Sequence, residues 1–158
     1  MEKLKIYYDS HKIEYKSPFG ALPCGEDIRF RIRIDRGAQG RDLESKCYLC
    51  IWDTNNTKKL VPMNRTKIKQ WDHSPQVYEA VYQTPKTPGL LWYYFKFNIG
   101  EQTLYYGNNK ETLGGRGMIY AHEPPGYQIT VYIPWETPNW YKGGIMYQIF
   151  VDRFHRGG

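Results

Sequence analysis

The sequence lacks the features of several protein classes. It has no apolar run long enough to span a membrane, and no apolar stretch follows residues 1–5, as a secretory leader requires. Its three cysteines are an odd number and cannot all pair within one chain. Unpaired cysteines without a leader are typical of a reducing compartment, so the sequence predicts a cytoplasmic protein with no membrane partner.

Clusters of metal or nucleotide ligands are also missing. Cys47 and Cys50 have the spacing of a zinc site, but they lie in a strand-like run, where residues three apart point to opposite faces. The glycine-rich stretch 114–117 is not followed by the lysine and hydroxyl residue of a phosphate-binding loop. We therefore expect no metal and no cofactor. The histidines are too scattered for ligand spacing: His11, His73, His122 and His155.

The charge does not identify a partner. The formal net charge is +6, from 22 basic and 16 acidic residues, but the basic residues are spread along the chain. A solvated basic surface explains this distribution better than a nucleic-acid site, which needs a basic patch with interleaved aromatic residues. We expect no nucleic-acid partner.

What the sequence does contain is strand-forming residues. Aromatic residues make up 16% of the chain, and aromatic side chains favour strands. The clearest pattern is 28–35, where Ile28, Phe30, Ile32 and Ile34 alternate with three arginines and a terminal aspartate. This alternation predicts a strand with one buried face.

About eight short strand patterns, separated by turn signals and with no convincing helix, predict an all-β fold. We interpret it as an immunoglobulin-like antiparallel β-sandwich. The remaining predicted strands are 6–15, 46–53, 59–63, 77–83, 90–99, 103–106 and 127–133. Residues 67–75 and 107–117 are predicted to be loops.

The last part of the chain follows a different pattern. Residues 145–151 are apolar with little alternation, which is typical of a strand buried on both faces of a parallel sheet. The run ends in the charged pair Asp152 and Arg153, at a strand end where α/β barrels place functional residues. Such a strand needs a crossover and a second strand. We therefore expect the natural protein to continue beyond this stretch.

Residues 147–154, together with 127–132 and 137–140, resemble the α-amylase family, glycoside hydrolase family thirteen. They are most similar to the neopullulanase, maltogenic amylase and cyclomaltodextrinase branch. The resemblance implies a starch-binding-module-like N-terminal sandwich over 1–133, a linker over 134–144, and the first strand of a truncated (β/α)8 barrel over 145–158. It implies a structural role for Asp152, and residues 155–158 depart from the family's calcium loop.

The resemblance also implies a function. The family's catalytic carboxylates stand on later barrel strands, so no catalytic residue is expected here, and the full-length protein is expected to be a glycoside hydrolase. The chain would then be a non-catalytic domain that contributes to α-glucan binding, to dimerisation, or to both. Its expected partners are α-glucan (starch, maltodextrin or cyclodextrin), its own catalytic barrel, and a second copy in a homodimer. The alternative is a docking and dimerisation module without a sugar site.

Four aromatic residues are the candidate sugar-binding surface. Trp92 and Tyr94 lie opposite the predicted core face of strand 90–99, and Tyr105 and Tyr106 lie across the hairpin from them. Flat sugar faces stack on such rings, and exposed aromatic patches mark binding surfaces. Trp52 and Trp71 are further options. The alternative is that these aromatic residues are covered by other parts of the protein and serve packing alone.

Overall fold

The strand with the clearest sequence pattern lies inside the first of two sheets. In the computed structural model, β4 spans Asp27–Asp35, and its Ile28, Phe30, Ile32 and Ile34 side chains are all fully buried. The alternate arginines are half-buried, and Arg31 pairs with Glu79 on the neighbouring strand at 2.5 Å. The predicted two-residue alternation is confirmed.

The structure describes residues 4–35, 45–66 and 76–150, and these ranges contain eleven strands and no helix. The predicted loop at 67–75, with Trp71 and His73, and the end of the chain from Val151 lie outside the described residues. Because the described part has no helix, it contains none that is long and apolar enough to cross a membrane.

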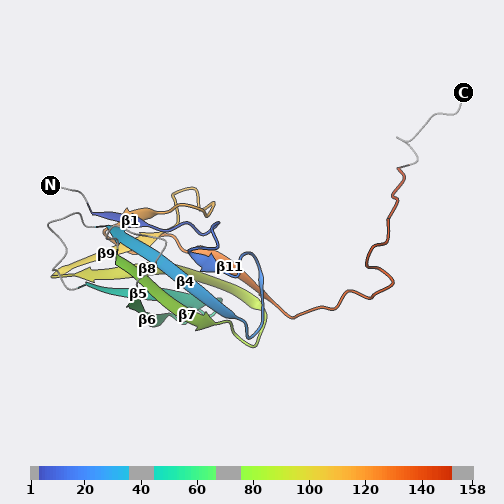
Figure 1. Cartoon of the computed structure of the whole chain (residues 1–158), viewed down its shortest axis with the longest axis horizontal. Helices are drawn as coiled ribbons and strands as arrows, with labels where there is room; N and C mark the ends of the chain where they lie inside the picture. Colours follow the sequence, from blue (N-terminus) through green and yellow to red (C-terminus); the bar gives the residue numbers. More distant parts are fainter. Residues whose placement is uncertain (1–3, 36–44, 67–75, 151–158) are drawn as a thin grey trace, which may run out of the picture.

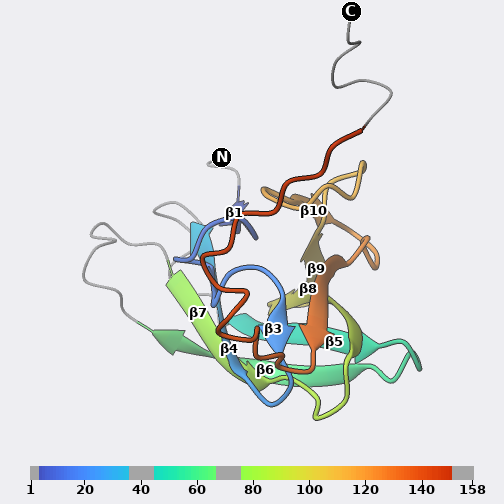
Figure 2. The same ribbon diagram turned by 90° about the vertical axis from the view of Figure 1, so that its right-hand side faces the viewer.

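The strands form two layers that pack face to face, as Figures 1 and 2 show. The first layer consists of β1 (Lys5–Tyr7), β2 (Lys16–Ser17), β4 and β7 (Gln76–Gln83). The second consists of β3 (Leu22–Pro23), β5 (Ser45–Asp53), β8 (Gly89–Ile99), β9 (Gln102–Gly107), β10 (Met118–Tyr120) and β11 (Tyr127–Tyr132). The predicted all-β sandwich is confirmed.

Strand β6 (Lys59–Thr66) joins the two layers. Residues 59–63 pair with β5 in the second layer, and residues 64–66 pair with β7 in the first. The hydrogen-bonded path therefore runs β1-β4-β7-β6-β5-β8-β11-β3 without a break. One pair differs from the predicted antiparallel pattern: β3 runs parallel to β11, with Leu22 opposite Val131.

The core lies between β4 and β8. Leu91, Tyr93, Phe95 and Phe97 of β8 are buried and face the isoleucines of β4, as the sequence pattern predicts. The ring of Phe30 lies 4.8 Å from that of Tyr93, centroid to centroid. Burying a large apolar side chain contributes about 1.5–3 kcal/mol, so this layer dominates the stability of the sandwich.

Four buried tyrosines, Tyr8, Tyr93, Tyr106 and Tyr127, form a cluster within the core. The hydroxyls of Tyr8 and Tyr93 are hydrogen-bonded at 2.7 Å. Tyr106 donates to the backbone oxygen of Tyr8 at 2.9 Å and accepts from the N–H of Gly117 at 3.1 Å. The Tyr127 hydroxyl has no hydrogen-bond partner among the described residues. Burial raises the pKa of Tyr106 to about 12, so its phenol stays neutral.

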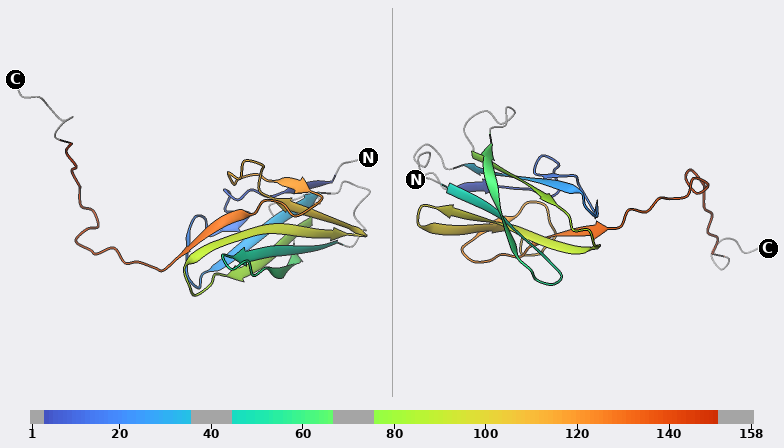
Figure 3. Two further views of the ribbon diagram at one scale, coloured as in Figure 1. Left: turned by 180° about the vertical axis from the view of Figure 1, so that it is seen from behind. Right: turned by 90° about the horizontal axis from the view of Figure 1, so that it is seen from below.

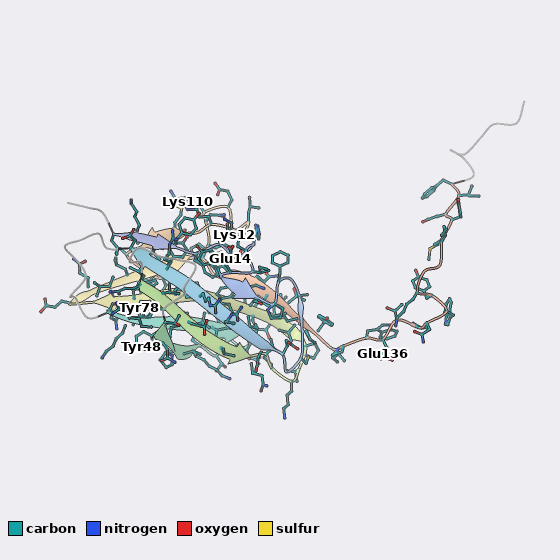
Figure 4. All side chains as sticks on the ribbon, in the orientation of Figure 1. Lys12, Glu14, Tyr48, Tyr78, Lys110 and Glu136 are labelled. Carbon is teal, nitrogen blue, oxygen red and sulfur yellow. The ribbon has the colours of Figure 1, made fainter. Side chains whose placement is uncertain are left out.

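The chain leaves the sandwich after β11 and runs away from it (Figures 1 and 3). Glu136 lies on this segment (Figure 4), as do Trp135 and Trp140, which are 84% and 82% exposed. Residues 145–150, where the sequence predicts the start of a strand, form no strand here. A strand needs a neighbour to accept its backbone hydrogen bonds, and no other described strand pairs with this segment.

The core assignment predicts the cost of two matched substitutions. Phe30→Ala should lower the free energy of unfolding by about 3–5 kcal/mol, because it empties space between the layers. Val81→Ala is the control, since Val81 on β7 lies opposite Arg29 on β4 and is 56% exposed. This substitution should change the free energy of unfolding by no more than about 0.5 kcal/mol. Urea denaturation measures both, and equal losses would contradict this placement of the core.

Candidate functional site

Three residues form a row across the outer face of the second sheet. Trp52 on β5 lies opposite Trp92 on β8, and Trp92 lies opposite Gln128 on β11. Directly opposed residues point to the same face, and neighbouring strands are roughly 4.8 Å apart. Both tryptophans are partly exposed and Gln128 is exposed. We call Trp52, Trp92 and Gln128 the tryptophan row.

The row is held on one side by the loop that precedes β11. A Cβ atom at Gly126 would lie 2.8 Å from Cη2 of Trp52 and 3.2 Å from Cβ of Trp92. The loop backbone therefore packs directly on both tryptophans, and glycine is the residue that permits this approach. This contact restrains the Trp52 ring and the base of the Trp92 side chain before any ligand arrives.

An ion pair lies next to Trp52. The Lys58 ammonium is 2.6 Å from Oε2 of Glu123, and it lies 5.4 Å from the Trp52 ring and 5.7 Å from the Tyr94 ring. These distances suit cation–π attraction. The hydrogen bond from Lys58, and then one from the Tyr94 hydroxyl, hold the pKa of the Glu123 carboxyl below its ordinary value. Both charged side chains are largely exposed, so this pair contributes well under about 1 kcal/mol.

The four predicted sugar-binding aromatics do not form one exposed surface. Trp92 and Tyr105 are partly exposed on the outer face, where Tyr105 lies opposite Lys96. Tyr94 points to the same face but is only 3% exposed, because the Lys58–Glu123 pair and Trp52 lie over it. Tyr106 is 1% exposed and faces the core. The placement of Tyr106 on the outer face was therefore wrong, since adjacent residues on a strand point to opposite faces.

Trp52 belongs to this surface more clearly than Tyr106 does, although the sequence offers it only as a further option. Its membership depends on the register of β5 against β8, which places it beside Trp92. The signal in the sequence was the position of Trp52 in the two-residue alternation of its strand. Trp52 is an even number of residues from Cys50 and Tyr48, and all three lie opposite the apolar face formed by Cys47, Leu49 and Ile51.

The cysteines and histidines form no reactive or metal-binding group in the described part of the chain. Cys47 faces the core, with its Sγ 3.4 Å from Sδ of Met63, whereas Cys50 points outward beneath Tyr94, as strand geometry predicts. Burial raises the pKa of the Cys50 thiol to about 11, so it is protonated at neutral pH. Among the described residues, no three His, Cys, Asp or Glu side chains gather as metal ligands would.

Because Tyr106 carries a hydrogen-bond network and the Tyr127 hydroxyl does not, two Tyr→Phe variants should differ. Tyr106→Phe removes a partner of both Tyr8 and Gly117 and should cost about 1–3 kcal/mol. Tyr127→Phe removes a buried hydroxyl without a described partner and should be neutral or stabilising. Chemical denaturation measures both. A larger loss for Tyr127→Phe than for Tyr106→Phe would contradict the network.

The depressed pKa of Glu123 predicts a pH-dependent environment for Trp52. Protonation of Glu123 removes the negative charge that holds Lys58. The weak stabilisation from the ion pair is fully present above the unfolded-state pKa of Glu123. It is lost as the pH falls through the folded-state pKa. The Trp52 indole N–H resonance should therefore shift in acid, with a midpoint below the ordinary pKa of glutamate. Glu123→Gln should abolish this titration. Its persistence in that variant would assign the shift to another group.

The chain is similar in sequence to parts of longer known proteins. No protein-family model matches the chain. An amylopullulanase from Thermoanaerobacter thermohydrosulfuricus is 39% identical over 159 residues, which cover 96% of this chain and 10% of the relative. An amylopullulanase from Thermoanaerobacterium saccharolyticum is 36% identical and covers 96% of this chain and 12% of the relative. The chain thus spans about one tenth of the length of these curated relatives.

A solved structure shares the fold. A cyclomaltodextrinase matches 93% of this chain and 23% of its own length, with a TM-score of 0.53 and 16% sequence identity. At this identity the match supports the fold, and the amylopullulanases supply the relationship in sequence. The chain is thus similar over 96% of its length to part of the amylopullulanases, and its all-β fold matches part of a cyclomaltodextrinase.

Proposed function

We propose that this chain is a non-catalytic domain of an α-glucan-degrading glycoside hydrolase, and that it binds α-glucan on the tryptophan row. The proposed division is a sandwich over 1–133, a linker over 134–144 and the first barrel strand over 145–158. The observation that carries the sugar-binding proposal is the register that sets Trp52 beside Trp92 on an outer sheet face.

The chemistry of the row suits a sugar chain. A pyranose ring has flat C–H faces that pack against an indole, and polar groups at its rim that need hydrogen bonds. The row offers two indoles, the exposed Gln128 side chain at one end, and Lys58 and Glu123 beside Trp52. Each stacked face contributes on the order of 1–2 kcal/mol, so two platforms support roughly millimolar binding after the entropy of association.

The same surface is poorly suited to hydrolysis. Retaining glycosidases place two carboxyl groups about 5 Å apart around the bond that they cleave. Glu123 lies beside the row but is already paired with Lys58, and burial of Cys50 leaves a neutral thiol. We infer that hydrolysis belongs to another part of the full-length protein.

Docking is the alternative function, and one observation favours it. An open groove of about 610 Å³ lies between β1 and β10, lined mainly by apolar side chains, among them Leu4, Ile6, Leu104, Met118 and Ile119. A surface of this kind suits contact with the domain's own catalytic barrel or with a second copy. The groove and the tryptophan row share no residue, so the two functions are compatible.

Sugar binding on the row is tested by titrating maltoheptaose into the intact chain while recording amide and indole NMR shifts. Trp52→Ala and Trp92→Ala should each weaken binding about 5- to 30-fold, the equivalent of about 1–2 kcal/mol. Trp135→Ala is the matched control, because Trp135 is 84% exposed on the segment that leaves the sandwich. Its affinity should equal that of the wild type.

Two results would count against the proposal. If the wild type shows no shift at several millimolar sugar, the sugar-binding function fails and docking takes its place. If the folded Trp52→Ala and Trp92→Ala variants keep full affinity, the sugar binds at another surface.

A further inference from the structure

A pocket of about 280 Å³ lies beside residues 127–130 of β11, ahead of the two residues that pair with β3 and where the tryptophan row ends. Its walls come from the turn that contains His11, the segment between β2 and β3 that contains Phe19, and the loop after β9. Lys12 and Lys110, on two of these segments, lie on the same side of the molecule (Figure 4). We call this cavity the edge pocket.

Lys16 brings an incompletely bonded ammonium group to the edge pocket. The residue is 4% exposed, and its Nζ donates to the backbone oxygens of Pro18 at 3.2 Å and Gly20 at 3.4 Å. The Phe19 ring lies 5.8 Å away. An ammonium group has three N–H donors, so one remains without an acceptor atom among the described residues. A buried donor of this kind favours a ligand that brings an oxygen to it.

The backbone of β11 supplies a second polar edge. Cys24 donates to the oxygen of Tyr132 at 2.8 Å, so the N–H and C=O groups of Tyr132 point toward β3. Backbone direction repeats every two residues along a strand. Gln128, four residues earlier, therefore points its N–H and C=O groups the same way, beyond the pairing with β3, which covers Val131 and Tyr132. Gln128 also lines the edge pocket.

These groups together favour a neutral polyhydroxylated ring. Phe19 is 56% exposed and offers an apolar face, Lys16 and the Gln128 N–H are donors, and the Gln128 C=O is an acceptor. None of the described residues that line the edge pocket is Asp or Glu, so the pocket is not suited to a metal cation. The free carbonyl group disfavours a purely anionic ligand, whereas a sugar hydroxyl both donates and accepts.

We propose that the edge pocket receives the terminal glucose unit of an α-glucan whose following units lie on the tryptophan row. The row leads from Trp52 through Trp92 to Gln128 across three adjacent strands, and Gln128 belongs to both the row and the pocket. This inference rests on the proposed sugar-binding function and adds to it a preference for chain ends. The pocket lies at the end of the row and has walls from three segments, which suits a terminal ring, whereas the row itself is a sheet face.

The test compares a linear with a cyclic sugar of the same size. Maltoheptaose has chain ends and β-cyclodextrin has none, so only the linear sugar can use the edge pocket. In the intact chain, Phe19→Ala should weaken maltoheptaose binding about five- to tenfold, the loss of one stacked face, and leave β-cyclodextrin binding unchanged. Phe19→Tyr should retain the wild-type affinities. Ile13→Ala is the control, because Ile13 is 65% exposed in the same part of the chain and does not line the pocket.

Amide shifts separate the remaining outcomes. Maltoheptaose should shift the Phe19 resonance together with those of Gln128 and the Trp92 indole, whereas β-cyclodextrin should shift only resonances of the tryptophan row and leave Phe19 unchanged. If both sugars shift the indoles and Phe19→Ala changes neither affinity, the terminal subsite is refuted while the proposed function stands. If neither sugar binds, both proposals fall. If inorganic phosphate shifts Phe19 and maltoheptaose does not, the pocket is an anion site and the sugar assignment is overturned.

Discussion

The arrangement of the sandwich depends on the hydrogen bonds made by phenol hydroxyls that are buried in its core. Tyr8, Tyr93, Tyr106 and Tyr127 are almost fully buried, and a buried hydroxyl without a partner is costly. Tyr8 bonds to Tyr93 across the two layers, and Tyr106 binds the backbone of Tyr8 and of Gly117. These bonds tie the start of the chain and the loop after β9 to the second sheet. The edge pocket is built from those same two segments, so its walls depend on the core network.

The same hydrogen bonds also determine which side chains of β8 lie on the outer face, because successive residues of a strand point to opposite faces. Because Tyr93 must face the core to meet Tyr8, Trp92 and Tyr94 must point outward. The opposite strand, β5, is fixed in the same way by Leu49 and Ile51, which leaves Trp52 on the outer side next to Trp92. The tryptophan row is thus a consequence of core packing in two strands. A shift of one residue in register would bury the indoles and expose the core tyrosines.

Much of this fold was predictable because long strands carry a clear period. The alternation at 28–35 and along 90–99 identified the buried faces of β4 and β8 correctly. The short strands β2, β3 and β10 have two or three residues, too few to show a period, so they could not be predicted from the sequence. At the candidate site, the two-residue alternation of a strand is enough to show that the adjacent residues Tyr105 and Tyr106 cannot both point outward. The covering of Tyr94 was beyond sequence reasoning, because Lys58 and Glu123 come from distant segments.

The two proposed functions, sugar binding and docking, use surfaces that differ in chemistry and in position. The tryptophan row and the edge pocket combine aromatic faces with hydrogen-bonding groups, which suits a ligand that exchanges with water. The groove between β1 and β10 is mainly apolar and is flanked by unpaired strand edges, which suits a lasting contact with protein. None of the residues that line the groove lines the edge pocket. Substitutions in the groove should therefore leave the tryptophan row and the edge pocket intact, so the proposed docking and the proposed sugar binding can be separated by mutation.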